Sequence, residues 1–213
     1  MNKRDKKVSV GIVGVGHLGE HHVKHFAEME NVQCVGFYDI DPVRAVLIGE
    51  KYKVKPYDSL QALLSDCDAV SIVTPTDTHF HIASDCINVG KHVFIEKPMC
   101  ISVQEAHRII GAAEASGKTL MVGYMKQHDP GFQYALTEVE KIPDIRLIQV
   151  NHIHPDNNLH LKEFNLYRFD DIPQEVIEHT RTLRAGAVHE AIGDVPDDVQ
   201  RVFAHLTGSM IHD

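Results

Sequence analysis

The sequence predicts an α/β fold, in which a doubly wound parallel sheet is followed by the start of an α+β second domain. Short apolar runs alternate with helical patterns through the first 124 residues, as they do in a parallel sheet with helices on both faces. A glycine-rich turn directly follows the first apolar run and opens the first helix. After Tyr124 the alternation stops, which indicates that a domain of another kind begins there.

Five runs have the length and composition of buried parallel strands. They are short and rich in valine and isoleucine, and charged residues, glycine or turn residues bound them. The predicted strands are Val8–Val13, Val32–Tyr38, Ala69–Val73, His92–Ile95 and Leu120–Val122.

Helices are expected between these strands, and several carry start or stop signals. Asp41 followed by Pro42 is typical of a helix with proline in its first turn. Ser102 and Glu105 have the spacing of a capping box, and Gly90 is a helix stop. The predicted helices cover His17–Ala27, a segment opening at Asp41-Pro42, Leu60–Leu64, Thr78–Asn88 and Ser102–Ala115.

The second domain is expected over residues 125–213. The pattern predicts a helix near Gly131–Glu140, a strand over Arg146–Ile153, and helices over Gln174–Ala191 and Asp197–Leu206. In the last of these, apolar residues recur at the spacing of one helix face.

Charge and composition argue against several classes of partner. The chain carries a net charge of −9, which repels a polyanion, so nucleic acid is not expected to bind. No apolar run reaches the roughly 18 residues that span a bilayer. The four cysteines lack CxxC spacing and suit free thiols, so a cytoplasmic protein is expected. The 16 histidines are not expected to form a metal site, because a site needs three or four converging ligands.

The glycine-rich turn carries the main functional signal. Gly14, Gly16 and Gly19 form a GxGxxG motif, with His17 and Leu18 between the last two. Such glycines allow a tight turn, backbone approach to a pyrophosphate, and close packing of helix on strand. The helix that follows offers free N–H groups to phosphate. The motif therefore predicts a Rossmann domain that binds a nicotinamide dinucleotide.

Asp39 supplies the context that makes this motif specific. It ends the second strand, 20 residues after Gly19, where a carboxylate accepts hydrogen bonds from ribose hydroxyls and repels a 2′-phosphate. We therefore expect NAD rather than NADP as cofactor. Arg44, five residues further on, is placed to reach a 2′-phosphate and limits that preference.

Lys97 is the candidate catalytic residue. It follows the strand His92–Ile95, at the strand end where ligands of open α/β sheets bind. A lysine beside a nicotinamide can exchange a proton with a substrate hydroxyl, and Pro98 restricts the backbone of Lys97 to extended geometry. On chemistry alone, a solvated lysine after a strand is an equally good reading.

Three segments together resemble the Gfo/Idh/MocA family of oxidoreductases. They are VGVGHLG, TPTDTHF and VFIEKP, and the resemblance covers residues 8–130. Residues up to Gly90 are most similar to bacterial members that act on UDP-N-acetylglucosamine at C3. The resemblance implies a Rossmann domain over 1–124, then a substrate and oligomerisation domain in a homo-oligomer. It also implies hydride exchange at a secondary alcohol carbon of a sugar or polyol substrate.

The resemblance also assigns roles to individual residues. Lys97 matches the lysine of the EKP motif, which shares the proton transfer and binds a substrate hydroxyl. Thr74 and Pro75 match the segment that borders the dinucleotide, and His79 matches the histidine of the following helix. Glu96 matches the glutamate near the nicotinamide ribose.

The end of the chain resembles the family's second catalytic motif only in part. His212 matches the catalytic histidine of a D-x-x-x-H pattern, but Gly208 stands where the acidic residue is expected. Family members continue well past this histidine, so either a fragment or a reduced variant with an exposed sheet edge is expected, and we favour the fragment.

Three functions remain open on the sequence. The leading hypothesis is an NAD-dependent dehydrogenase acting on CH–OH groups through Lys97 and His212. A non-catalytic dinucleotide-binding regulator, similar to the yeast galactose-regulon repressors, is the alternative that Gly208 favours. The third is a fragment that binds NAD and turns nothing over.

Overall fold

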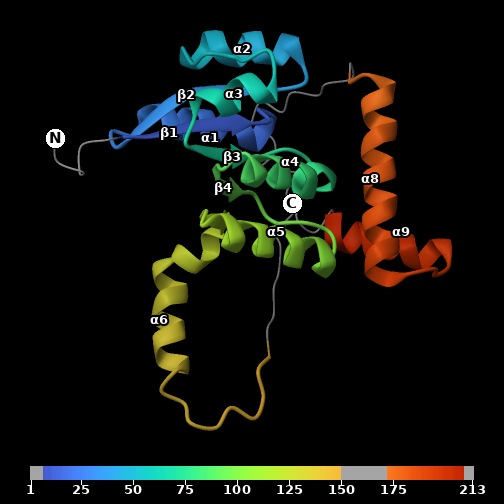
Figure 1. Cartoon of the computed structure of the whole chain (residues 1–213). Coiled ribbons are helices and arrows are strands. Elements are labelled where there is room, and N and C mark those ends of the chain that lie inside the picture. Colours follow the sequence, from blue (N-terminus) through green and yellow to red (C-terminus); the bar gives the residue numbers. More distant parts are fainter. Residues whose placement is uncertain (1–6, 150–171, 209–213) are drawn as a thin grey trace, which may run out of the picture. The chain divides into compact units, whose positions relative to one another are not determined.

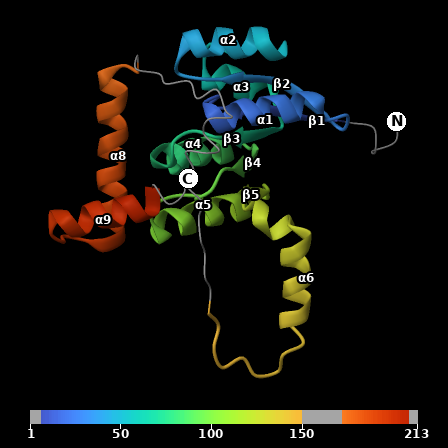
Figure 2. The ribbon, with the colours of Figure 1, turned by 180° about the vertical axis from the view of Figure 1, so that it is seen from behind.

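The computed structural model of the chain describes residues 7–149 and 172–208. Within them, five parallel strands form one sheet in the order β2-β1-β3-β4-β5 (Figure 1). β5 is labelled in the reverse view of Figure 2. The predicted α/β class and all five predicted strands are confirmed. The strands are β1 (Val8–Val13), β2 (Val32–Tyr38), β3 (Ala69–Ile72), β4 (His92–Ile95) and β5 (Leu120–Val122).

The helices begin where the predicted caps lie. Asp41 accepts hydrogen bonds from the N–H groups of Val43 and Arg44, and Ser102 with Glu105 forms the expected capping box. The helix after β3 starts two residues earlier than predicted. The helices are α1 (His17–Glu28), α2 (Pro42–Tyr52), α3 (Leu60–Asp66), α4 (Thr76–Asn88), α5 (Val103–Ser116), the 3₁₀ turn η1 (Met125–His128), α6 (Pro130–Val139), α8 (Gln174–Ile192) and α9 (Asp197–Gly208).

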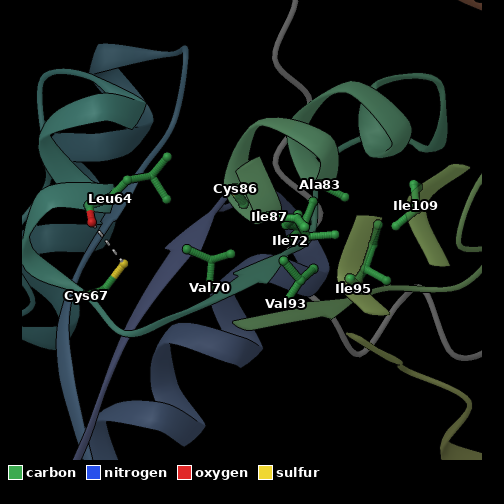
Figure 3. Close-up of a cluster of buried hydrophobic side chains, with 11 residues drawn as sticks. Leu64, Cys67, Val70, Ile72, Ala83, Cys86, Ile87, Val93, Ile95 and Ile109 are labelled. Atoms are coloured by element: carbon green, nitrogen blue, oxygen red, sulfur yellow. Dashed lines mark hydrogen bonds between the residues drawn. The ribbon is translucent and has the colours of Figure 1, made fainter. Parts of the chain in front are cut away.

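Alternation along the strands assigns the helices to the two faces of the sheet. Successive side chains of a strand point to opposite faces. Ile12 of β1 packs in one buried cluster with residues of α1 and α2. Val70 and Ile72 of β3 pack in another cluster with residues of α3, α4 and α5 (Figure 3). The sheet is therefore covered on both sides, as its apolar strands require.

The strand order creates a switch point between β1 and β3. The chain leaves β1 toward β2 on one side, whereas β3, β4 and β5 follow one another on the other side. Connections that run in opposite directions leave a crevice at the carboxyl ends of the two central strands, which is where ligands of such sheets bind.

Contacts divide the chain into two units, with a boundary at Gly123/Tyr124. The described residues 172–208 belong with the sheet rather than with residues 124–149. Helix α8 packs on α4 and α5: Arg184 donates to Asp77 at 2.8 Å, and Arg108 makes two 2.7 Å bonds with Glu190. The expectation that 125–213 forms one separate domain stays a prediction.

The predicted strand Arg146–Ile153 is wrong over its described part. Residues 146–149 have no regular structure, and Leu147 and Ile148 are exposed; residues 150–153 lie outside the described residues. A strand needs a hydrogen-bonding neighbour, and no described residue pairs with this segment. In the same unit, Asp129 caps the start of α6, and its carboxylate accepts from the N–H groups of Gly131 and Phe132.

Candidate functional site

The glycine-rich turn joins β1 to α1 in a conformation that excludes larger residues at two positions. Gly14 has φ +85°, and a Cβ there would lie 2.9 Å from Cγ2 of Thr74. Its N–H donates to the carbonyl of Tyr38 at 2.8 Å. At Gly19 a Cβ would lie 2.0 Å from the carbonyl oxygen of Gly14. Both glycines therefore serve the close packing of α1 and β3 around this turn.

Gly16 has a different environment. It is the N-cap of α1 and makes no side-chain cap hydrogen bond. A Cβ there would meet one atom within 4 Å, Nη1 of Arg44 at 3.3 Å. The first-turn N–H groups of α1 thus have no side-chain acceptor from the N-cap, which is the arrangement that binds phosphate at helix starts. His17 and Leu18 begin this first turn, where Leu18 is exposed and the ring of His17 contacts that of His21.

Asp39 connects the end of β2 to the glycine-rich turn. One carboxylate oxygen accepts from the N–H of Val15 at 2.7 Å and the other from the N–H of Asp41 at 2.9 Å. Each oxygen has further lone-pair capacity for ribose hydroxyls. The sequence predicts Asp39 as a cofactor-binding residue, but its role in bracing the turn is visible only in the structure.

Thr74 and Pro75 follow β3, opposite Gly14 across the switch point. The Thr78 hydroxyl donates to Oγ1 of Thr74 at 2.8 Å. His79 is fully buried, with Nε2 2.8 Å from the Thr74 carbonyl and Nδ1 2.8 Å from the Pro98 carbonyl. His79 therefore ties the segment after β3 to the segment after β4 and lies beneath the site.

Glu96 and Lys97 follow β4 and lie next to this pair of segments. The Glu96 N–H donates to the Ile72 carbonyl at 2.9 Å, and the Lys97 N–H donates to the Glu96 carboxylate at 3.2 Å. The Lys97–Pro98 peptide is cis. Burial alone would raise the pKa of Glu96, but hydrogen bonds and charge from His22 and Lys97 hold it below its usual value.

His22 is a site residue that the sequence reasoning missed. Its Nε2 lies 3.3 Å from the Glu96 carboxylate and its Nδ1 lies 2.8 Å from the Ser71 hydroxyl. The available signal was its helical spacing, because His22 follows Gly19 by three residues and so lies on the same side of the helix. His212 lies outside the described residues.

A cavity of about 480 Å³ lies between the glycine-rich turn and α2. Its lining includes Val15, Arg44 and Lys51. The Lys51 amine donates a hydrogen bond to Glu20 of α1 at 2.6 Å.

The carboxyl ends of β1 to β4 bring together the predicted site residues of the described part of the chain. These are the glycine-rich turn, Asp39, Thr74, Pro75, Glu96 and Lys97.

Two negative findings apply to the described residues. None of their helices is long and apolar enough to cross a membrane. Their His, Cys, Asp and Glu side chains form no group of three or more that would hold a metal ion.

The fold and the glycine-rich turn define a dinucleotide-binding Rossmann protein. Residues 8–124 match the oxidoreductase family with an NAD-binding Rossmann fold, named Gfo/Idh/MocA. The chain belongs to this family, and the predicted resemblance is confirmed.

Two relatives, and a solved structure of one of them, show how far the likeness extends. A UDP-N-acetylglucosamine 3-dehydrogenase of Acidithiobacillus ferrooxidans is 39% identical over 124 residues, or 58% of this chain and 39% of the relative. An inositol 2-dehydrogenase of Salmonella paratyphi B is 31% identical over 59% of this chain and 39% of the relative. A solved structure of the Acidithiobacillus dehydrogenase superposes with a TM-score of 0.59, at 36% identity over 62% of this chain and 43% of that one. The matches thus span about two fifths of each relative's length.

Proposed function

We propose that the chain contains the dinucleotide-binding part of an NAD(P)-dependent dehydrogenase acting on a secondary alcohol of a sugar, inositol or nucleotide sugar. The observation that carries this proposal is the convergence of the glycine-rich turn, Thr74-Pro75 and Glu96-Lys97 at one sheet edge. The named activities of the relatives, on UDP-N-acetylglucosamine and inositol, support the substrate class.

NAD is the proposed cofactor, with NADP the weaker ligand. The absence of a side chain at Gly16 and the uncapped start of α1 suit a pyrophosphate. The carboxylate of Asp39, held by two backbone N–H groups, suits the ribose hydroxyls and opposes a 2′-phosphate. When bound, the nicotinamide supplies the hydride acceptor or donor of the reaction.

Lys97 is proposed to carry the proton transfer. Its backbone is fixed by its hydrogen bond to Glu96 and by the segment that His79 holds. From this position the side-chain amine takes the proton of the substrate hydroxyl during oxidation and returns it during reduction. His212 is proposed as the second polar group of the substrate site.

The experiment compares Lys97→Ala with a control, Lys118→Ala. Lys118 lies just before β5, at the amino end of that strand. Turnover is followed as NADH absorbance with polyols and nucleotide sugars. It is measured on this chain and on a form extended by any further sequence that its gene encodes. Lys97→Ala should lower turnover by roughly 10²–10⁴-fold with little change in NAD affinity, and Lys118→Ala should leave both unchanged.

Two results would reject parts of this proposal. Full turnover in Lys97→Ala would remove Lys97 from the proton transfer. NAD binding without turnover in either form, across the substrate panel, would support the non-catalytic regulator instead.

A further inference from the structure

A partly buried polar chain links α1 to the segment after β4. Ser71 is fully buried in β3 and lies on the sheet face that α1 covers, since its neighbours Val70 and Ile72 pack on the opposite face. The His22 ring reaches from α1 to the Ser71 hydroxyl at 2.8 Å and to the Glu96 carboxylate at 3.3 Å. It also lies 5.8 Å, between ring centroids, from Phe94 of β4.

When the His22 ring is neutral, the chemistry of its two partners assigns its tautomer. An ionised carboxylate only accepts hydrogen bonds, whereas a hydroxyl can donate or accept. The proton of the neutral ring is therefore on Nε2, facing Glu96, and Nδ1 accepts from the Ser71 hydroxyl. A buried hydroxyl that fixes one nitrogen in this way orients the other.

The Glu96 carboxylate is held on its other sides as well. Its second oxygen accepts from the Lys97 N–H at 3.2 Å. Gly123, directly after β5, leaves the room that this carboxylate occupies, because a Cβ there would lie 2.9 Å from Oε1. The carboxylate thus lies between α1, the Lys97 backbone and the end of β5.

We infer that His22 is a positioning residue that fixes the Glu96 carboxylate and, through it, the backbone of Lys97. His22 lies on the helix whose first turn is the proposed pyrophosphate site, so it links that site to the proposed catalytic lysine. This inference rests on the proposed function for its catalytic consequence, but the link between the three residues can be tested without turnover.

The test compares His22→Leu with His25→Leu, an exposed histidine on the same helix. Carbon-13 NMR follows the titration of the Glu96 carboxyl, and nitrogen-15 NMR follows the Lys97 amide. Burial is the largest influence on Glu96, so its pKa should rise when His22 is removed and should not move in His25→Leu. The Lys97 amide signal should shift in the same variant only.

Further variants keep the test decisive. His22→Gln retains a hydrogen-bond donor for Glu96. Its Glu96 pKa and Lys97 amide signal should therefore lie between those of wild type and His22→Leu. Ser71→Ala, which removes one hydroxyl, should shift the Glu96 pKa and the Lys97 amide signal in the same direction as His22→Leu, but by less. It replaces His22→Leu in the test if that variant does not fold. Gly123→Ala should disturb the Lys97 amide from the opposite side of the carboxylate.

Kinetics supply the catalytic readout. In the full chain, His22→Leu should lower kcat by about 10²-fold, as small misplacements of a reacting group do. Unaltered Glu96 and Lys97 signals in His22→Leu, or equal changes in His25→Leu, would overturn the inference. Absence of turnover in every protein, wild type included, would count against the proposed function alone, since the NMR result still decides the role of His22.

Discussion

Replacing Gly16 by valine separates the folding role of the glycine-rich turn from its binding role. An added Cβ at Gly16 meets only one atom within 4 Å, Nη1 at the end of the Arg44 side chain, at 3.3 Å, and the backbone φ of −61° is negative. The unliganded protein should therefore keep its stability within about 0.5 kcal/mol. At Gly19 the same addition meets the Gly14 carbonyl oxygen at 2.0 Å, so Gly19→Ala should destabilise the fold instead.

The loss of binding follows from the hydrogen bonds that the pyrophosphate would lose. Two charge-assisted bonds at about 1.5 kcal/mol or more each give a loss of about 3 kcal/mol, which is roughly 10²-fold in affinity. With NAD at about 100 times the wild-type Kd, ligand stabilisation is about 2.7 kcal/mol, or about 5–10 °C in Tm for a chain of this size. In Gly16→Val it should fall to about 0.4 kcal/mol, or roughly 1 °C.

The assay is thermal unfolding with and without NAD, with circular dichroism as the check on the fold. Gly111→Val is the matched control, because no heavy atom lies within 4 Å of a Cβ at Gly111 in α5. It should respond to NAD as the wild type does. An undiminished Tm increase in Gly16→Val would refute the assignment of this turn to the pyrophosphate.

Two further predictions test other parts of the molecule. Wild-type protein should bind NAD more tightly than NADP, and Asp39→Ala should reduce this difference in affinity. Calorimetric dissociation constants that favour NADP by tenfold in the wild type, or about 1.4 kcal/mol, would contradict the role assigned to Asp39. Burial, together with the hydrogen bond to Asp66, raises the pKa of Tyr57 from 10.0 to about 12. Since the folded pKa is the higher one, the stability from protonated Tyr57 is present below pH 10 and is lost as the pH rises to 12. The free energy of unfolding, measured with urea, should therefore fall less between pH 10 and 12 in Tyr57→Phe than in wild type. An equal fall in both proteins would contradict this account.

The sequence by itself determined the features that depend on neighbours along the chain. Apolar runs, Asp41 with Pro42, and the Ser102–Glu105 pair specify strands and helix starts locally, so their bounds were predicted to within two residues. The GxGxxG turn and Asp39 identified the dinucleotide-binding class, because their spacing reflects one strand–turn–helix–strand unit. The strand expected at Arg146 failed for the complementary reason: an apolar pattern forms a strand only where another strand pairs with it.

Only the tertiary structure decided how the separate site segments support one another. His22 and His25 are the same residue type on one helix, and what separates them is that one faces β3 and β4 while the other faces outward. The strand order β2-β1-β3-β4-β5 places Ser71 and Glu96 against α1, although 25 residues separate them in sequence. Such contacts arise from sheet register and helix crossing, which no short sequence window encodes, because the free energy that selects them is shared across the whole packed core.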